Sequence, residues 1–348
     1  MHGIKAIADA LDLSASTVSR ALNGVYGVNP QTRKLVEEMA QKMGYIPHLG
    51  AKQLVSNHSN LIGVFLPEFE PMVYAGYLDM FSPVQRELHK LNKDTLFFSI
   101  PFLNYPAQRL VECISSRRLE GCLLFSGFSS RHPIVQEAIR LKIPTVNFEN
   151  VVDEHCSSVV SNDWEGGRLV AQLLLRNGHR KMGYIGGPPN VRCSVERYSG
   201  FVAALAEYGI VHEQRQIATG YFTGEGGADG AMELLHRNPD MTAIFCANDL
   251  MAIGAIAALS SCGVRVPDQM SIVGYDDDIY AAHTSPPLTT VHHQLEETSV
   301  MSAQLLQELL EGNYGRGVFI PPQLVERRSV RNLIDDDGRS SENDSHHR

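Results

Sequence analysis

The sequence predicts a chain of two parts, an all-α domain at the N-terminus and a larger α/β domain of two lobes. The first observation is a set of three short amphipathic helical patterns within residues 1–46. The second is the alternation of apolar strand-like runs with helical patterns over residues 61–330. This stretch is longer than one doubly wound sheet usually needs, so two similar lobes with a cleft between them are the economical interpretation.

The N-terminal region has clear helix boundaries. Its first helix has apolar residues on one face, at Ile4, Ile7, Ala8 and Leu11. Ser14 can cap a second helix, which Asn23 and Gly24 end, and Pro30 suits the first position of a third. A helix, a tight turn and a second helix within 24 residues are typical of a helix-turn-helix domain, whose second helix enters the major groove of DNA.

Candidate DNA-reading side chains lie on the second helix. Ser16 and Thr17 can hydrogen-bond to bases or phosphates, and Arg20 can hold guanine O6 and N7 with two parallel bonds. Ser19 and Asn23 complete the candidate set. Two alternatives stay open: Arg20 taken alone equally fits a solvated helix arginine, and Asn23 equally fits a helix cap.

The long region predicts parallel sheets covered on both faces. Apolar runs suggest strands at residues 61–66, 95–100, 121–126, 144–148, 182–186, 243–247 and 271–275, and helical patterns include 164–176, 195–208 and 250–261. Ligands of such sheets bind at the carboxyl ends of strands. Polar and aromatic residues follow these ends at Glu68, Phe69, Ser126, Glu149, Asn150, Asn162, Asp163, Asn248, Asp249 and Asp276.

Charge is unevenly distributed. The net charge is −9, but residues 1–59 carry +2, which leaves −11 for the rest. An acidic body discourages unspecific binding to nucleic acid, so DNA affinity must come from a few well-placed contacts and from dimerisation.

Several function classes are disfavoured. The six cysteines are scattered with no CxxC pair, which favours reduced thiols over disulfides or a zinc site. We expect no metal, cofactor or catalytic residue, because the chain has no phosphate loop or nucleophile elbow, and His292 and His293 read as ordinary strand residues. No apolar run suits a membrane span and the first residues do not form a signal peptide, so we expect a cytoplasmic protein and disfavour an exported solute-binding protein.

Longer motifs carry a family resemblance. The N-terminal strings LSASTVSRALNG (residues 13–24), VNPQTR (28–33) and MGYIP (43–47) resemble the LacI/GalR family of bacterial repressors. The resemblance continues through RNGHRKMGYIGG (176–187), ERYSGF (196–201), ANDLMAIG (247–254), SIVGYDD (271–277) and PLTTV (287–291). It implies an α/β domain that resembles two-lobe periplasmic binding proteins.

The resemblance implies a hinge after the reading domain. Leu54 matches the leucine that wedges into the minor groove, where an apolar side chain unstacks a base step. Lys52 stands where the family usually has arginine, and lysine lacks the planar fork of that residue. Leu54 taken alone equally fits a core residue.

The resemblance also implies an effector site. By motif position, Arg197 would hold an anionic or hydroxyl group, while Asn248 and Asp276 would bind ligand hydroxyls. Phe222 and Tyr74 could pack on the flat face of the ligand. Asn248 equally fits the cap of the following helix, and Asp276 equally fits a turn.

Together these implications describe a transcriptional regulator. We expect residues 1–46 to bind DNA, 47–60 to form the hinge, 61–333 to bind effector and dimerise, and 334–348 to be a disordered tail. The lobes would be roughly 61–160 with 292–320, and 162–290. The partners would be pseudo-palindromic operator DNA, a second copy (or three, in a tetramer) and a small molecule, with no membrane. A sugar inducer is weakly favoured over a nucleobase ligand. A solute-binding protein or an enzyme of the same fold is the alternative.

Overall fold

The computed structural model describes residues 3–23, 26–45, 58–68, 74–100, 107–126, 128, 130–189 and 191–334. Most of the hinge predicted at 47–60, including Lys52 and Leu54, lies outside these residues, as does the tail after residue 334. The chain divides into two compact units, Met1–Leu61 with Cys113–Glu120, and Ile62–Glu112 with Gly121–Arg348. None of the described helices is both long and apolar enough to cross a lipid bilayer.

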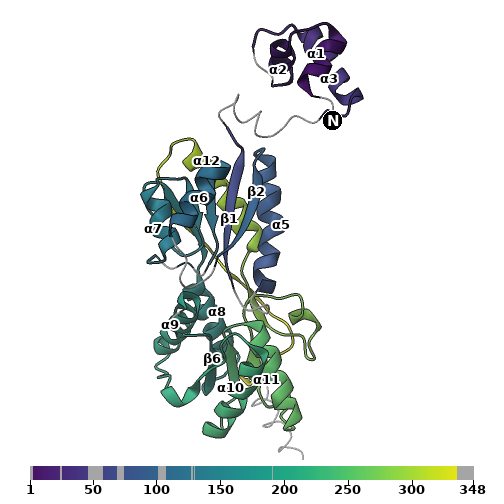
Figure 1. The fold of residues 1–348 in the computed structure, drawn as a ribbon. Helices are drawn as coiled ribbons and strands as arrows, with labels where there is room; N and C mark the ends of the chain where they lie inside the picture. Colours follow the sequence, from purple (N-terminus) through teal and green to yellow (C-terminus); the bar gives the residue numbers. More distant parts are fainter. Residues whose placement is uncertain are drawn as a thin grey trace, which may run out of the picture. The chain divides into compact units, whose positions relative to one another are not determined.

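The N-terminal helices have the boundaries that the punctuation residues predict. They are α1 (Ile4–Leu11), α2 (Ala15–Leu22) and α3 (Pro30–Lys42), shown in purple in Figure 1. The oxygen of Ser14 accepts from the backbone N–H of Thr17, and that of Asn29 accepts from Gln31. Each helix contributes to one small core, formed by Ile7, Ala8, Val18, Ala21, Val36 and Ala40.

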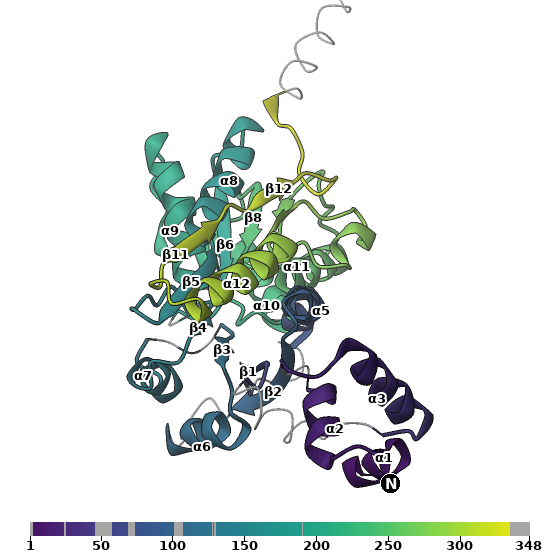
Figure 2. The ribbon, with the colours of Figure 1, turned by 90° about the horizontal axis from the view of Figure 1, so that it is seen from above.

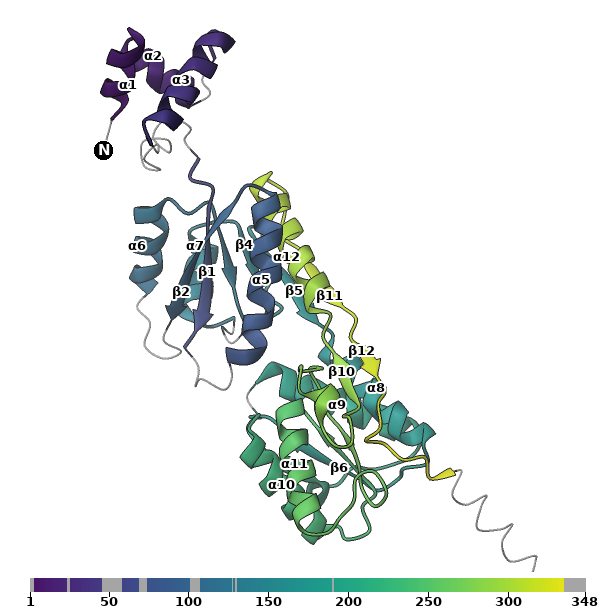
Figure 3. The same cartoon turned by 90° about the vertical axis from the view of Figure 1, so that its right-hand side faces the viewer.

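A six-stranded sheet forms the first lobe of the α/β domain. Its spatial order is β11 (Gly317–Ile320), β5 (Cys156–Ser161), β4 (Thr145–Asn147), β3 (Gly121–Leu124), β1 (Leu61–Pro67) and β2 (Asp94–Ile100). Its helices are α5 (Tyr74–Lys90), α6 (Ala107–Arg117), α7 (Pro133–Arg140) and α12 (Leu295–Leu310). Helices α5 and α12 pack side by side on one face, and α7 lies on the other (Figure 3).

A four-stranded parallel sheet forms the second lobe. Its order is β7 (Ile217–Thr219), β6 (Met182–Gly186), β8 (Ala243–Cys246) and β9 (Ser271–Val273). Its helices are α8 (Asp163–Arg176), α9 (Arg192–Glu207), α10 (Gly224–Arg237) and α11 (Asp249–Ser261), with short 3-10 turns at Gln214–Gln216 and Ala281–His283. The α8–α9 pair and the α10–α11 pair cover opposite faces (Figure 1).

The chain passes between the two sheets more than once. Strand β5 belongs to the first sheet and α8 to the second lobe, and β10 (Thr290–His292) pairs antiparallel with β12 (Gln323–Val325). Figure 2 shows β11, β12 and α12 beside one another in yellow. Residues 323–333, which the sequence analysis assigned to neither lobe, bond to the second one. Ser329 O accepts from Ile272 N at 2.8 Å, and Leu333 N donates to Asn177 O at 2.9 Å.

Candidate DNA-reading helix and effector site

The start of α2 is held by its own hydroxyl groups. Ser14 Oγ caps the helix and lies 2.8 Å from both Ser16 Oγ and Thr17 Oγ1. Ser16 is exposed and Thr17 is half-buried. The capping role predicted for Ser14 is therefore present, and the hydroxyl groups of Ser16 and Thr17 lie beside it at the start of the helix.

Arg20 is exposed on α2 and forms one hydrogen bond within the part of the chain that the structure describes. Its Nη2 donates to the backbone oxygen of Tyr26 at 3.1 Å. A guanidinium has five N–H donors, so most of the Arg20 donors are not used by the described residues. Tyr26 itself is 96% exposed, which is unusual for a large aromatic ring. The sequence analysis missed Tyr26, because no periodicity marks a loop residue.

The other predicted residues of α2 bond to each other. Asn23 Nδ2 donates to Ser19 O at 2.8 Å and lies 3.4 Å from Ser19 Oγ. Asn23 is also the C-cap residue of α2. The capping role considered for Asn23 is thus present, and its amide nitrogen donates to a backbone oxygen of α2 itself.

Four of the five predicted effector residues form one connected group. Arg197 Nη1 donates to Asp276 Oδ1 at 3.3 Å and also to the backbone oxygen of Ala247, the residue before Asn248. Asn248 Nδ2 in turn donates to the backbone oxygen of Phe222 at 3.2 Å. Tyr74 begins α5, and its side chain lies outside what the structure describes.

Arg197 is buried, with 4% of its surface exposed, and most of its donors are occupied by the protein. Its Nε donates to Asp163 Oδ1 at 2.8 Å, and its guanidinium stacks 3.7 Å above the centre of the Tyr275 ring. Burial opposes the charge, but Asp163 and Asp276 raise the pKa of Arg197 well above its usual value. Arg197 therefore stays charged and holds the side chains of Asp163 and Asp276 in place.

Asp163 is the acidic centre of this group. It is 2% exposed and begins α8 directly after the cap residue Asn162, whose oxygen accepts from Glu165 N. Burial opposes its ionisation, but Arg197, His293 and Arg192 outweigh burial and lower the pKa of Asp163. Its negative charge is a fixed part of the site.

The prediction that His293 is an ordinary strand residue is wrong. Strand β10 ends at His292, and the next residue places Nε2 2.8 Å from Asp276 Oδ1 and 3.1 Å from Arg197 Nη2. One nitrogen cannot both donate to the carboxylate and accept from the guanidinium. The shorter contact to a charged acceptor favours a proton on Nε2 that is donated to Asp276.

Asn248 and Phe222 have structural partners. Asn248 Oδ1 caps α11 by accepting from Met251 N at 2.9 Å, so the alternative raised from its sequence position is present. Phe222 is half-buried, and a Cβ added to Gly187 would lie 2.1 Å from its ring. The amide oxygen and the amide nitrogen of Asn248 are thus both hydrogen-bonded to the protein backbone. The Phe222 ring occupies the space beside Gly187 where a side chain would otherwise lie.

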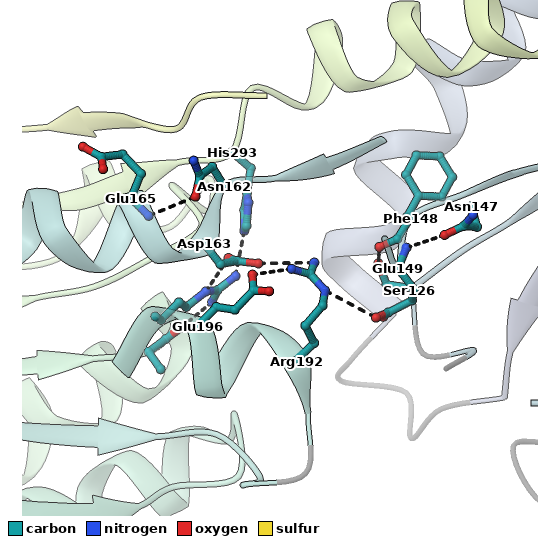
Figure 4. Close-up of polar contacts among 12 residues, drawn as sticks. Ser126, Asn147, Phe148, Glu149, Asn162, Asp163, Glu165, Arg192, Glu196 and His293 are labelled. Carbon is teal, nitrogen blue, oxygen red and sulfur yellow. Dashed lines mark hydrogen bonds and ion pairs between the residues drawn. The ribbon is translucent and has the colours of Figure 1, made fainter. Parts of the chain in front are cut away.

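Arg192 is the residue that sequence reasoning overlooked. Figure 4 shows its guanidinium among three carboxylates, those of Glu149, Asp163 and Glu196. Motif matching could not find Arg192, because the residue lies between the motifs at 176–187 and 196–201. The sequence did offer Glu149, which follows a predicted strand. A partly buried glutamate at the end of a strand needs a positively charged partner, and Arg192 is that partner.

Sequence comparisons agree with this architecture. Residues 3–48 match the family described as "Bacterial regulatory proteins, lacI family", and residues 171–330 match a "Periplasmic binding protein-like domain". The "HTH-type transcriptional repressor PurR" of Actinobacillus pleuropneumoniae serotype 3 (strain JL03) is 32% identical over 340 residues, covering 96% of this chain and 99% of the relative.

Solved structures give the same result. The "transcriptional regulator CelR-cellobiose complex" is 28% identical with a TM-score of 0.72, covering 94% of this chain and 100% of that one. A lac repressor dimer bound to operator and the anti-inducer ONPF has a TM-score of 0.83 at 24% identity, covering 95% and 99%, and shows the fold alone. The fold, with its helix-turn-helix domain and two α/β lobes, is confirmed, and the relatives are DNA-binding regulators rather than enzymes. The chain belongs to the LacI family of bacterial transcriptional regulators.

Proposed function

We propose that this regulator represses transcription from a pseudo-palindromic operator, which it binds as a homodimer in the bacterial cytoplasm, and that a small molecule controls the binding. In this proposal residues 1–46 read DNA, residues 47–60 link the domains, and residues 61–333 bind the effector and pair the chains. The lac repressor relative is a dimer on its operator, which supports the dimeric arrangement.

The reading surface that we propose is the exposed side of α2. Arg20 reaches base edges, Ser16 and Thr17 contact bases or phosphates, and Tyr26 packs against the sugar-phosphate backbone. The exposure of Arg20 with most of its donors unused supports this role. Ser19 and Asn23 support the helix from behind, and Lys52 and Leu54 contact the minor groove.

The effector site that we propose is the polar group around Arg197 and Asp276, with Asn248 and Phe222 beside it. The observation that carries the proposal is this group of charged side chains, gathered at the carboxyl ends of strands from both sheets. A sugar or sugar derivative that acts as inducer is favoured, because one relative is a cellobiose complex.

The test is selection of binding sites from random duplex DNA by the full-length protein, followed by affinity measurements with and without a metabolite panel. We expect one pseudo-palindromic sequence to be enriched and at least one metabolite to weaken its binding about tenfold or more. Enrichment of no sequence would remove the DNA-reading proposal. A metabolite that strengthens binding would change the proposed inducer into a corepressor.

A further inference from the structure

Arg192 connects the two lobes through its guanidinium. It is the first residue of α9, in the second lobe, and its Nε lies 3.5 Å from Oε2 of Glu149, which follows β4 of the first lobe. Its Nη2 lies 3.5 Å from Asp163 Oδ2, and its Nη1 donates to Glu196 (Figure 4). One side chain is thus placed among carboxylates from both lobes.

The donors of Arg192 are only partly used, in contrast to those of Arg197. The contacts of Arg192 with Glu149 and Asp163 are both 3.5 Å long, and among the described residues its buried Nε has no hydrogen-bond partner. A buried donor without a partner is costly, so its presence in a site indicates a group that a ligand can satisfy. Arg197 offers less of this kind, because its guanidinium already donates to Asp163, to the backbone oxygen of Ala247 and to Asp276.

Exposure also favours the Arg192–Glu149 pair as the part that a ligand reaches. The side chains of Arg192 and Glu149 are 24% and 15% exposed, whereas those of Arg197 and Asp163 are 5% and 3% exposed. Ser194, two residues after Arg192, adds a buried hydroxyl that forms no hydrogen bond with the described residues. Besides Asp276, whose side chain is 38% exposed, the polar groups that a ligand can reach therefore include Arg192 at the start of α9 and Glu149 of the other lobe.

The charge of the group restricts what can bind. Two guanidinium groups, of Arg192 and Arg197, and the ring of His293 face a larger number of carboxyl groups, those of Glu149, Asp163, Glu196 and Asp276. A carboxylate or phosphate on the ligand would add to this negative excess in a partly buried place, where repulsion is weakly screened. A hydroxyl group avoids the repulsion, since it can accept from Arg192 and donate to Glu149 at the same time.

We propose that Arg192 and Glu149 are effector-binding residues supplied by opposite lobes, and that they select an uncharged polyhydroxylated ligand over its carboxylate and phosphate derivatives. This inference rests on the proposed function, in which the α/β domain binds a small effector. Arg192 donates Nε–H and Nη2–H to ligand oxygens, and Glu149 accepts from a neighbouring hydroxyl. The bound ligand would thereby replace the 3.5 Å ion pair between Arg192 Nε and Glu149 Oε2.

The experiment measures thermal stabilisation and affinity of the full-length protein with matched ligand sets. The sets are cellobiose with cellobionate, glucose with glucuronate and glucose 6-phosphate, galactose with galacturonate, and ribose with ribose 5-phosphate. We expect an uncharged member to raise the melting temperature and its charged derivatives to bind at least about tenfold more weakly. Arg192→Gln should weaken the uncharged ligand about tenfold, and Glu149→Gln should narrow the gap between the uncharged ligand and its carboxylate.

The matched control is Glu207→Gln, which removes a carboxylate that pairs with Arg168 outside the site. It should change neither affinity nor preference, and each variant should keep the operator affinity of the wild type. Tighter binding of a charged derivative, no stabilisation by any uncharged member, or wild-type affinities in both site variants would each overturn the inference. Operator binding is measured in parallel, so its loss in the wild type would instead overturn the proposed function.

Discussion

Two arginines in this chain differ in how many of their donors the protein itself uses. Arg197 is buried and contacts Asp163, Ala247, Asp276 and His293, whereas exposed Arg20 donates one hydrogen bond, to the Tyr26 backbone. Motif position predicted both residues as ligand contacts, but a motif does not reveal how its side chain is partnered. That depends on residues such as His293, which come close only after folding.

Arg20→Ala should lower affinity for the selected operator far more than affinity for random duplex. Direct base contacts contribute roughly 1–3 kcal/mol each, and a dimer loses two of them. Fluorescence anisotropy with both duplexes at one salt concentration checks this. The control is Lys34→Ala, an exposed residue of α3. An equal loss on both duplexes would mean that Arg20 contacts phosphates only.

Asp276→Asn should preserve operator binding but weaken the response to effector about tenfold or more. The change removes the negative charge that faces Arg197 and His293, and with it a half-exposed acceptor for ligand hydroxyls. The measurement is the metabolite concentration that halves operator binding. The response should persist in Asp240→Asn, where a surface carboxylate pairs with Lys181. A normal response in Asp276→Asn would exclude this residue from the effector site.

At the scale of elements, residue pattern predicted the strands that lie within mostly apolar runs, including three-residue β4 and β9, but missed polar strands and strands outside such runs. Runs such as 182–186 and 61–66 were identified because nearly every residue is apolar and buried on both faces. Strand β5 has the sequence CSSVVS and escaped notice, although its first five residues are buried. Strands β7 and β12 have three residues each and do not lie within a longer apolar run, so their place in the fold comes from the strands that pair with them.

Close packing of α8 and α9 links helix geometry to the effector site. A Cβ added to Gly200 would lie 1.8 Å from the Trp164 backbone oxygen. Gly200→Ala must therefore separate the two helices that carry Asp163 and Arg197. We expect a loss of roughly 1–3 kcal/mol in unfolding free energy and a weakened effector response, measured by urea titration and ligand binding. Ser199→Ala, one residue earlier and exposed, is the control and should be neutral.

His179 ties the C-terminal segment to the second lobe and should make stability depend on pH. Its Nδ1 lies 2.9 Å from Thr242 Oγ1 and its Nε2 3.1 Å from Arg331 O, while burial lowers its pKa from 6.5 to about 4. The unfolded chain protonates His179 at a higher pH than the folded chain does. The contribution of neutral His179 to the free energy of unfolding is therefore complete above pH 6.5 and is lost as the pH falls towards 4.

The expected loss from this group is roughly 2–3 kcal/mol over that interval. Urea unfolding of the wild type and of His179→Gln at several pH values separates it from other groups. The variant should be less stable at pH 7 and less sensitive to acid. Parallel pH profiles for the two proteins would exclude His179 as the cause.

At the scale of the whole molecule, the helix-turn-helix region and the α/β domain carry net charges of opposite sign. The first 59 residues carry +2 while the remainder carries −11, so the acidic α/β domain opposes unspecific attachment to DNA. We expect operator affinity to fall roughly 10³-fold between 50 and 200 mM salt if the dimer makes about six phosphate contacts. Affinities measured across this range give the slope, and a flat dependence would contradict a mode of binding that relies on phosphates.

The pairing of β10 with β12 has a consequence for synthesis of the protein. The six-stranded sheet is completed by β11, and the second lobe by the segment 323–333, so both lobes wait for residues near the end of the chain. The three N-terminal helices share a core of their own and can fold as soon as they leave the ribosome. A nascent chain therefore carries a folded helix-turn-helix domain well before its α/β domain is complete. A messenger RNA truncated near its 3′ end would yield a helix-turn-helix domain joined to an incomplete α/β domain.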